Sequence, residues 1–214
     1  MYSFYVIMIL VIDMNLLGSK TFETERLFLR KSSMQEQKRL WEILMIPEVN
    51  KWYLTSAKKH ANDKNHWSWD SQEKFYQMKV EKASLDNTFC WSIFLKGDYS
   101  NSGSEEVIGQ ISSPVIDNDE AYRDIGWFID PLYQRNGYST EAARVILKYL
   151  FDEVNISTII SCAVKDNRGS CKLFEKLGFM KTGEEMRVSP YTFYEGNLIF
   201  NIYELNRERY KENN

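Results

Sequence analysis

The sequence predicts a single α/β (α+β) domain built on one mixed sheet. Three observations support this: 214 residues suit one medium domain, 43% of them are apolar, and segments of strand-like and helix-like periodicity alternate. With only four prolines and ten glycines, the composition is typical of a packed globule rather than a disordered or fibrous chain. A chain of this size buries about 70% of its unfolded surface, so the core needs no disulfide or metal.

The strand-like segments carry alternating or continuous apolar residues bounded by turn signals. The sequence predicts strands at 26–31, 89–96, 107–116, 122–129, 158–164, 179–188 and 198–205. The segment 97–103 is rich in glycine, serine and asparagine and is expected to be an exposed turn. The last two strands, joined by the loop 189–197, are expected to form a terminal β-hairpin.

The helix-like segments show apolar residues at helical spacing. The predicted helices are 34–45, one or two helices within 50–88, then 141–154 and 168–177. Ser32 or Ser33 is expected to cap the first helix, which Pro47 ends, and Gly178 is expected to close the last one.

Charge and cysteine content exclude several classes of protein. The net charge of −3, without a long block of lysine and arginine, argues against a nucleic-acid partner. Three cysteines without a C-x-x-C pair indicate free thiols and a reducing, cytoplasmic location. The two histidines form no H-E-x-x-H motif, so we expect no metal.

The first twelve residues (MYSFYVIMILVI) are almost wholly apolar. They are too few to span a bilayer as a helix, which needs about 20 residues, and they lack the features of a secretory signal, so we expect no membrane partner. Three interpretations remain: an added strand or helix, a membrane-associating tail, or a start placed too early, with Met14 the true one. We therefore expect a leader at 1–13 and a domain at 14–210.

The most informative window runs from 125 to 143, IGWFIDPLYQRNGYSTEAA. A strand, a turn containing Gly137 and a helix N-terminus together create an anion site, because backbone N–H groups converge there and the helix dipole adds about half a positive charge. Gly137 lets the backbone approach a phosphate, and Arg135 offers a charged contact. An ordinary strand-to-helix connection is the alternative interpretation. The G-x-G-x-x-G and P-loop motifs do not occur.

A second window follows the strand TIISCAV and reads N-R-G-S-C-K-L-F-E-K-L-G-F at 167–179. With Q-R-N-G-Y-S at 134–139, it resembles the GCN5-related N-acetyltransferase (GNAT) superfamily, whose patterns are Q/R-x-x-G-x-G/A and N-x-x-S/A-x-x-x-Y/F-E-K-x-G-F. The opening T-E-R-L-F-L-R (24–30) and the strand I-G-W-F-I-D-P are similar to the RimJ/RimL-type branch, which acetylates protein N-terminal and related amines. The resemblance covers roughly residues 20–207.

The resemblance implies the GNAT fold: a single mixed, mostly antiparallel sheet of six to seven strands, splayed at the acetyl-CoA site and flanked by about four helices. It also implies acetyl-CoA as co-substrate. By residue-by-residue correspondence, the binding positions are Trp127, Phe128, Ile129, Gln134, Arg135, Asn136, Gly137, Tyr138, Ser139, Thr140, Asn167, Ser170 and Phe174.

Two residues depart from the family pattern. Ser139 replaces the usual glycine or alanine, which crowds the loop slightly but adds a hydroxyl. Phe174 stands where many relatives have a tyrosine proposed as general acid. The absence of this tyrosine is tolerable because a thiol has a pKa of about 8.5 and leaves with little acid assistance. Ser170 is a candidate substitute donor, although a first-turn helix residue that satisfies backbone groups is the alternative interpretation.

Asp124 is the candidate base, where the family commonly has a glutamate that acts directly or through water. The shorter aspartate favours a water relay. The alternative is a strand-edge carboxylate in an ion pair with Arg123 or Arg135. Glu141, in the first turn of a helix, is expected to complement the helix dipole rather than to act as base. Glu184, Glu185 and Glu195 are weaker candidates for base or substrate contact.

The acceptor pocket of this fold lies between the early helices and the terminal hairpin loop. These segments contain aromatic residues that either line an amine pocket or belong to the core: Trp41, Trp52, Tyr53, Trp67, Trp69, Phe75, Tyr76, Tyr191, Phe193 and Tyr194. The acceptor is expected to be a primary amine, either a protein N-terminus or a small molecule. A non-catalytic acyl-CoA sensor is the alternative function, and both a monomer and a homodimer remain open.

Overall fold

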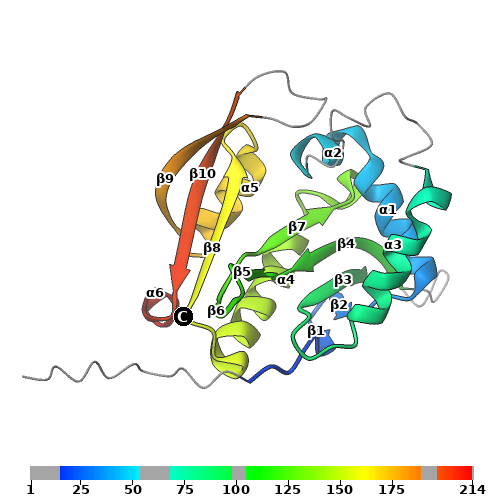
Figure 1. The fold of residues 1–214 in the computed structure, drawn as a ribbon, viewed down its shortest axis with the longest axis horizontal. Coiled ribbons are helices and arrows are strands. Elements are labelled where there is room, and N and C mark those ends of the chain that lie inside the picture. Colours follow the sequence, from blue (N-terminus) through cyan, green and yellow to red (C-terminus); the bar gives the residue numbers. More distant parts are fainter. Residues whose placement is uncertain (1–14, 54–67, 98–104, 189–196, 214) are drawn as a thin grey trace, which may run out of the picture.

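The computed structural model describes residues 15–53, 68–97, 105–188 and 197–213. Within them, ten strands form two five-stranded sheets, ordered β1-β2-β3-β4-β7 and β5-β6-β8-β10-β9 (Figure 1). The strands are β1 (Phe22–Glu23), β2 (Leu27–Arg30), β3 (Cys90–Leu95), β4 (Glu106–Ser112), β5 (Val115–Ile116), β6 (Asp119–Arg123), β7 (Gly126–Ile129), β8 (Thr158–Val164), β9 (Met180–Val188) and β10 (Asn197–Asn206). The helices are α1 (Met34–Met45), α2 (Pro47–Tyr53), α3 (Trp69–Lys82), α4 (Tyr138–Lys148), α5 (Arg168–Lys176) and α6 (Arg207–Glu212).

The mixed α/β class is confirmed, and α1 has the predicted bounds. Ser33 caps α1: its hydroxyl accepts a hydrogen bond from the Glu36 amide, and the Glu36 carboxylate accepts one from the Ser33 amide. Pro47 does more than end α1, because it also begins α2. Helix α4 begins at Tyr138, three residues before the predicted start, and a π-helical extension continues it to Val154.

The division into two sheets differs from the single sheet expected. The segment 122–129, predicted as one strand, is split at Asp124 and Ile125. Before the split, β6 pairs in parallel with β8, and after it, β7 pairs in antiparallel with β4. The predicted strand 107–116 is likewise broken beside Pro114, which has no N–H to donate. The chain thus passes from one sheet to the other, and the sheets splay where it crosses.

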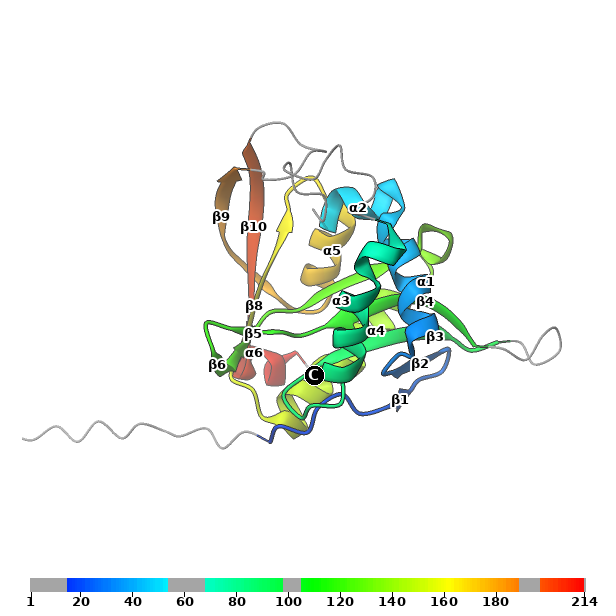
Figure 2. The same ribbon diagram turned by 45° about the vertical axis from the view of Figure 1, so that its right-hand side comes forward.

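Helices cover both faces of the first sheet. Adjacent strand residues point to opposite faces, so each strand contributes side chains to both helix layers. On β2, Leu27 and Leu29 belong to the cluster that contains α4 residues, whereas Phe28 packs with the α1 cluster. Figures 1 and 2 show the sheet between α4 on one side and α1 with α3 on the other. The α4 cluster continues into β8, β10 and α5, so one core joins both sheets.

Several sequence predictions fall outside the described residues. They concern the leader 1–13, the turn at 98–103, most of the hairpin loop, Trp67, Tyr191, Phe193, Tyr194 and Glu195. No helix in the described part of the chain is both long enough and apolar enough to cross a membrane.

Candidate active site

The segment between β7 and α4 forms a loop held by its own side chains. Asp130 accepts a hydrogen bond from the Leu132 amide at 3.0 Å, and the Gln134 amide side chain donates to the carbonyl of Ile129 at 3.0 Å. The Asn136 side chain donates to the carbonyls of Tyr133 and Gln134, both at 3.2 Å. Gln134 and Asn136 therefore shape residues 134–139, which we call the Gly137 loop.

Gly137 has φ = +84°, a left-handed conformation that glycine adopts without steric cost, and Arg135 has φ = +66°. Gly137 is the N-cap of α4 and offers no side chain to the helix N-terminus. The first helical bond runs from the Glu141 amide to the Gly137 carbonyl. Among the described residues, no acceptor occupies the amides of Gly137, Tyr138, Ser139 and Thr140. An exposed helix N-terminus with these amides is suited to an anion.

Glu141 stabilises the start of α4 from the side. Its carboxylate accepts hydrogen bonds from the Thr24 hydroxyl at 2.6 Å and from the Arg26 amide at 3.0 Å, and forms an ion pair with the Arg26 guanidinium. Although burial alone raises the pKa of Glu141, these hydrogen bonds and the charge of Arg26 bring its pKa below the ordinary value. Glu141 therefore remains ionised, and its carboxylate oxygens are bound by Thr24 and Arg26. This agrees with the structural role expected for Glu141.

Within the described part of the chain, the strand β7 pairs with a neighbouring strand on one side. On one side, Trp127, Phe128 and Ile129 pair with β4. On the other side, the described residues form no ladder between β7 and β8, whose neighbours are β6 and β10. A hydrogen bond of 2.8 Å from the Ser161 hydroxyl to the Ile125 carbonyl links the strands below the opening. Backbone groups at this edge are positioned to pair with an extended chain.

The α5 residues lie beside the same opening. Asn167 is the N-cap of α5, and its side-chain oxygen accepts a hydrogen bond from the Ser170 amide at 3.2 Å. Asn167 thus uses one acceptor site of its oxygen for the helix, and its NH₂ group can donate to a ligand. Ser170 is half-buried. Phe174 is 1% exposed, with its ring 4.6 Å from Trp127 and stacked at 4.7 Å on Tyr203.

Asp124 lies at the crossing between the two sheets. Its carboxylate accepts a hydrogen bond from the next amide, Ile125, at 2.7 Å, and the residue is half-buried. An ion pair with Arg123 does not form, because the Arg123 guanidinium pairs with Glu120 and donates to the Ser113 carbonyl. None of the ion pairs among the described residues includes Asp124. Its carboxylate therefore keeps capacity for water or substrate.

Asp124 acts electrostatically on Cys162 of β8. Burial raises the pKa of the Cys162 thiol, and the charge of Asp124 adds to this effect, while Arg187 opposes it. Cys162 is a free thiol and is half-buried. Trp52 of α2 packs on the sheet face that carries Cys162, so α2 connects the first helices to the second sheet.

The early aromatic residues divide between two roles. Trp41, Trp69 and Tyr76 form a chain of ring contacts at 5.8 and 5.5 Å between α1 and α3, which is a packing role. Phe75 points outward and is 51% exposed. Trp52 lies against the sheet face that carries Cys162, and the side chain of Tyr53 is outside the described part of the structure.

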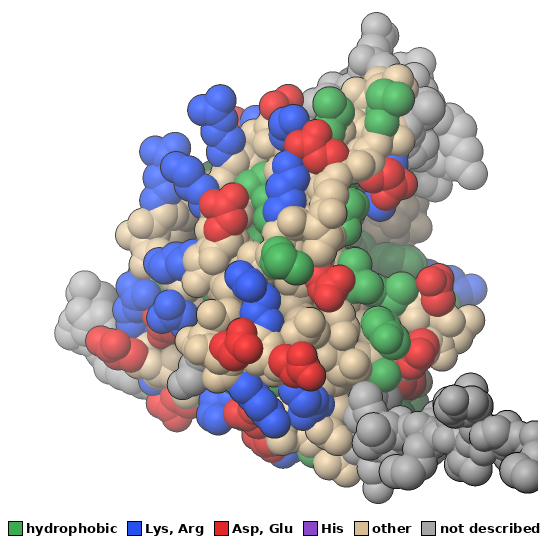
Figure 3. All heavy atoms as spheres, turned by 90° about the vertical axis from the view of Figure 1, so that its left-hand side faces the viewer, with side chains coloured by type: hydrophobic (Ala, Val, Ile, Leu, Met, Phe, Trp, Pro, Cys, Tyr) green, Lys and Arg blue, Asp and Glu red, His purple; other side chains and the backbone are tan. Residues whose placement is uncertain are grey.

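The candidate carboxylates on β9 are already paired. Glu184 forms ion pairs with Lys165 and Lys181, and Glu185 pairs with Arg187. Figure 3 shows lysine, arginine, aspartate and glutamate side chains mixed on the side of the molecule that carries β9. These pairs reduce the availability of Glu184 and Glu185 as bases.

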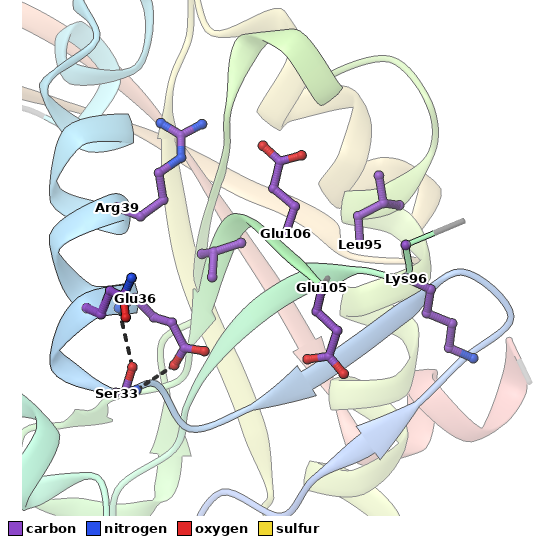
Figure 4. Close-up of a pocket in the computed structure, with 10 residues that line it drawn as sticks. Ser33, Glu36, Arg39, Leu95, Lys96, Glu105 and Glu106 are labelled. Carbon is purple, nitrogen blue, oxygen red and sulfur yellow. Dashed lines mark hydrogen bonds between the residues drawn. The ribbon is translucent and has the colours of Figure 1, made fainter. Parts of the chain in front are cut away.

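A surface cavity of about 620 Å³ lies between α1 and the adjoining ends of β3 and β4 (Figure 4). It is distinct from the opening at β7. Its charges are compensated within the protein: Arg30 pairs with Glu36 and Glu105, and Arg39 forms an ion pair at 2.5 Å with the buried Asp130. The Arg39–Asp130 pair, which the sequence analysis missed, connects α1 to the turn that precedes the Gly137 loop.

A family model described as an acetyltransferase (GNAT) domain matches residues 26–180, well over half of the chain. The chain belongs to this family. It is 40% identical over 104 residues to the uncharacterized N-acetyltransferase YnaD of Bacillus subtilis, an alignment that covers 49% of this chain and 57% of that protein. It is 25% identical over 188 residues to the uncharacterized N-acetyltransferase YoaA of the same species, covering 87% and 97%. The chain is an N-acetyltransferase.

The fold is shared with RimL, a ribosomal L7/L12 α-N-protein acetyltransferase solved in complex with coenzyme A. The TM-score is 0.68 at 15% identity, and the match covers 89% of this chain and 99% of RimL. At this identity the likeness shows the fold alone, and it is the family model that confirms the superfamily expected from the two sequence windows.

Proposed function

We propose that the protein transfers an acetyl group from acetyl-CoA to a primary amine, in a complex that holds both substrates together. The observation that supports this most directly is the combination of the Gly137 loop with the opening between β7 and β8, where the described residues form no ladder. The loop offers backbone amides to a diphosphate, and the strand edge offers backbone groups to the amide-containing pantetheine arm. Few ligands other than coenzyme A combine these two features.

The residues assigned from the family pattern suit this ligand. The amides of Gly137 to Thr140 are available to the diphosphate, and the exposed Arg135 side chain lies at the same loop. Trp127, Phe128 and Ile129 contribute the strand edge, and Asn167 contributes its NH₂ group. Phe174 supplies an apolar wall beside the thiol end. When bound, acetyl-CoA supplies a thioester whose carbonyl carbon the amine attacks.

The reaction requires one proton to move. The amine nitrogen forms a bond to the carbonyl carbon, the carbon–sulfur bond breaks, and the nitrogen loses a proton. Asp124, half-exposed at the crossing of the sheets, accepts this proton through a water molecule. The sulfur leaves as a thiolate and takes up a proton as the thiol, assisted by a hydrogen bond from the Ser170 hydroxyl.

The acceptor class proposed is an α-amine at a protein N-terminus or a similar small-molecule amine. RimL, whose fold this chain shares, acts on a protein α-amine by its name. An α-amine with a pKa of about 7.8 is roughly one-tenth neutral at pH 7. A lysine side chain with a pKa of about 10.4 is neutral in roughly one molecule in two thousand. A single half-buried aspartate is better suited to deprotonating an α-amine than a lysine side chain.

The test is steady-state release of CoA thiol with a panel of amines: N-terminal peptides, free amino acids, polyamines and aminoglycosides. We expect turnover with at least one α-amine that depends on acetyl-CoA. Tight acetyl-CoA binding without turnover on any acceptor would instead support a non-catalytic acyl-CoA sensor. The observation that favours this second function is Phe174, which lacks the hydroxyl found in many relatives.

A further inference from the structure

The turn that carries Thr24 and Arg26 belongs to the T-E-R-L-F-L-R segment, to which the proposed reaction assigns no role. This turn is closed twice: the Thr24 amide donates to the Leu27 carbonyl at 2.9 Å, and the Leu27 amide donates to the Thr24 hydroxyl at 2.9 Å. Lys96, the residue after β3, holds the turn in place, because its ammonium donates to the Thr24 carbonyl at 2.5 Å and its amide to the Arg26 carbonyl at 3.0 Å. The backbone that presents Arg26 is therefore rigid.

Arg26 reaches from this turn to the start of α4. Its Nε donates to Glu141 at 2.8 Å, its Nη2 lies 2.6 Å from the same carboxylate, and its guanidinium lies 4.7 Å from the ring centre of Tyr138. The Thr24 hydroxyl donates to the other oxygen of Glu141 at 2.6 Å. The carboxylate of Glu141 thus binds the turn that carries Thr24 and Arg26, more than 100 residues earlier in the chain.

The remaining Arg26 contact is with the Gly137 loop itself. Nη1 donates to the carbonyl of Asn136 at 2.9 Å. In a trans peptide the carbonyl and the following N–H point in opposite directions. By holding the Asn136 carbonyl, Arg26 therefore directs the Gly137 amide away from itself, toward the side from which an anion approaches. A Cβ on Gly137 would lie 3.5 Å from Nη2, so the guanidinium packs directly against this glycine.

The charge of Arg26 does not explain this arrangement, because Glu141 neutralises it at the point of contact. What Arg26 supplies is geometry: a planar fork that contacts a carboxylate and a carbonyl together. A lysine in its place keeps the charge but cannot make both contacts in a fixed orientation.

We propose that Arg26, supported by Thr24 and Glu141, is a positioning residue that holds the Gly137 loop in its anion-binding shape and thereby sets the affinity for the diphosphate of coenzyme A. This inference rests on the proposed function, since it assigns the diphosphate to the Gly137 loop.

The test measures, by titration calorimetry, the Kd of CoA and of pantetheine, which lacks the diphosphate. For Arg26→Gln we expect CoA binding to weaken about tenfold, the effect of losing one charge-assisted hydrogen bond, while pantetheine binding changes less than about twofold. Arg26→Lys should remain close to Arg26→Gln. The matched control is Arg30→Gln, which removes an arginine of the same segment that pairs with Glu36 and Glu105, and should leave both Kd values unchanged.

The outcomes separate the two proposals. Failure of the wild-type protein to bind CoA would overturn the proposed function and this inference together. Normal CoA binding by Arg26→Gln, an equal loss for CoA and pantetheine, or full recovery in Arg26→Lys would overturn the positioning role alone. Thermal unfolding of each variant accompanies the titrations, because a folded Arg26→Gln protein with unchanged pantetheine affinity excludes general loss of structure.

Discussion

At the residue scale, the reaction depends most on Asp124. Under the proposed mechanism, Asp124→Asn lowers kcat by about 10²–10⁴-fold, the usual contribution of a general base, with little change in the Kd of acetyl-CoA. Steady-state kinetics between pH 6 and 9 and a separate binding titration measure the two effects. Asp119→Asn is the matched control, because Asp119 lies on the same stretch of chain and only accepts a hydrogen bond from the Ala121 amide. An unchanged kcat in Asp124→Asn across this range would remove Asp124 from the mechanism.

Glu141 provides a second prediction at the residue scale. Its pKa is lowered in the folded protein, so it contributes stability above the ordinary glutamate pKa of about 4.3 and loses that contribution as the pH falls through its folded value. We expect Glu141→Gln to destabilise the protein by about 1–2 kcal/mol at pH 7. The difference from the wild type should shrink below about pH 4.3, as measured by urea unfolding at a series of pH values. A difference that does not change with pH would contradict the ionised role of Glu141.

The sequence predicts the Gly137 loop better than it predicts the contact between Arg26 and Glu141. The spacing around Gly137 predicts the Gly137 loop because the turn, glycine and helix start are contiguous. The partner of Arg26 is a carboxylate 115 residues away. Such a contact depends on the packing of β2 against α4, which no local pattern encodes, so the sequence analysis did not single out Arg26.

At the element scale, the pairing of β4 with β7 depends on Gly109. A Cβ at this position would clash with the backbone carbonyl oxygen of Phe128 on β7. We expect Gly109→Ala to destabilise the protein by roughly 1–3 kcal/mol, because the two backbones must separate. The midpoint of thermal unfolding measures the effect. Gly183→Ala on β9 is the control, since no atom lies within 4 Å of its added Cβ, and it should change the midpoint little.

Local chemistry predicts some elements well and others poorly. The predicted bounds of α1 are confirmed because its capping box, Ser33 with Glu36, is written within four residues. The split of the segment 122–129 into β6 and β7 leaves no comparable signal. The residues 122–129 contain no proline, and the division arises because β8 pairs with the first half of the segment and β4 with the second. A tertiary cause of this kind is not visible in the periodicity.

At the scale of the whole molecule, two connections make the sheets one unit. Arg123 of β6 is fully buried and donates to the Ser113 carbonyl at 2.9 Å, just beyond β4, while its guanidinium packs on Phe89 at 4.1 Å. The main core cluster also runs from Leu29 of the first sheet to Tyr203 of the second. The opening at β7 is therefore a local splay in a continuous core rather than a boundary between two domains.

This continuity predicts a single cooperative unfolding transition. The thiols report on each sheet separately, because Cys90 belongs to β3 of the first and Cys171 to α5, which packs on the second. With increasing urea, both thiols should become reactive over the same range of concentration. Arg123→Met should lower that midpoint by leaving the Ser113 carbonyl unpaired, at a cost of about 1–3 kcal/mol, while the two thiols still respond together. Exposure of Cys171 well before Cys90 would show that the second sheet unfolds alone. In that case the splay would separate two units, and the geometry between Asp124 and the Gly137 loop would depend on contacts other than this shared core.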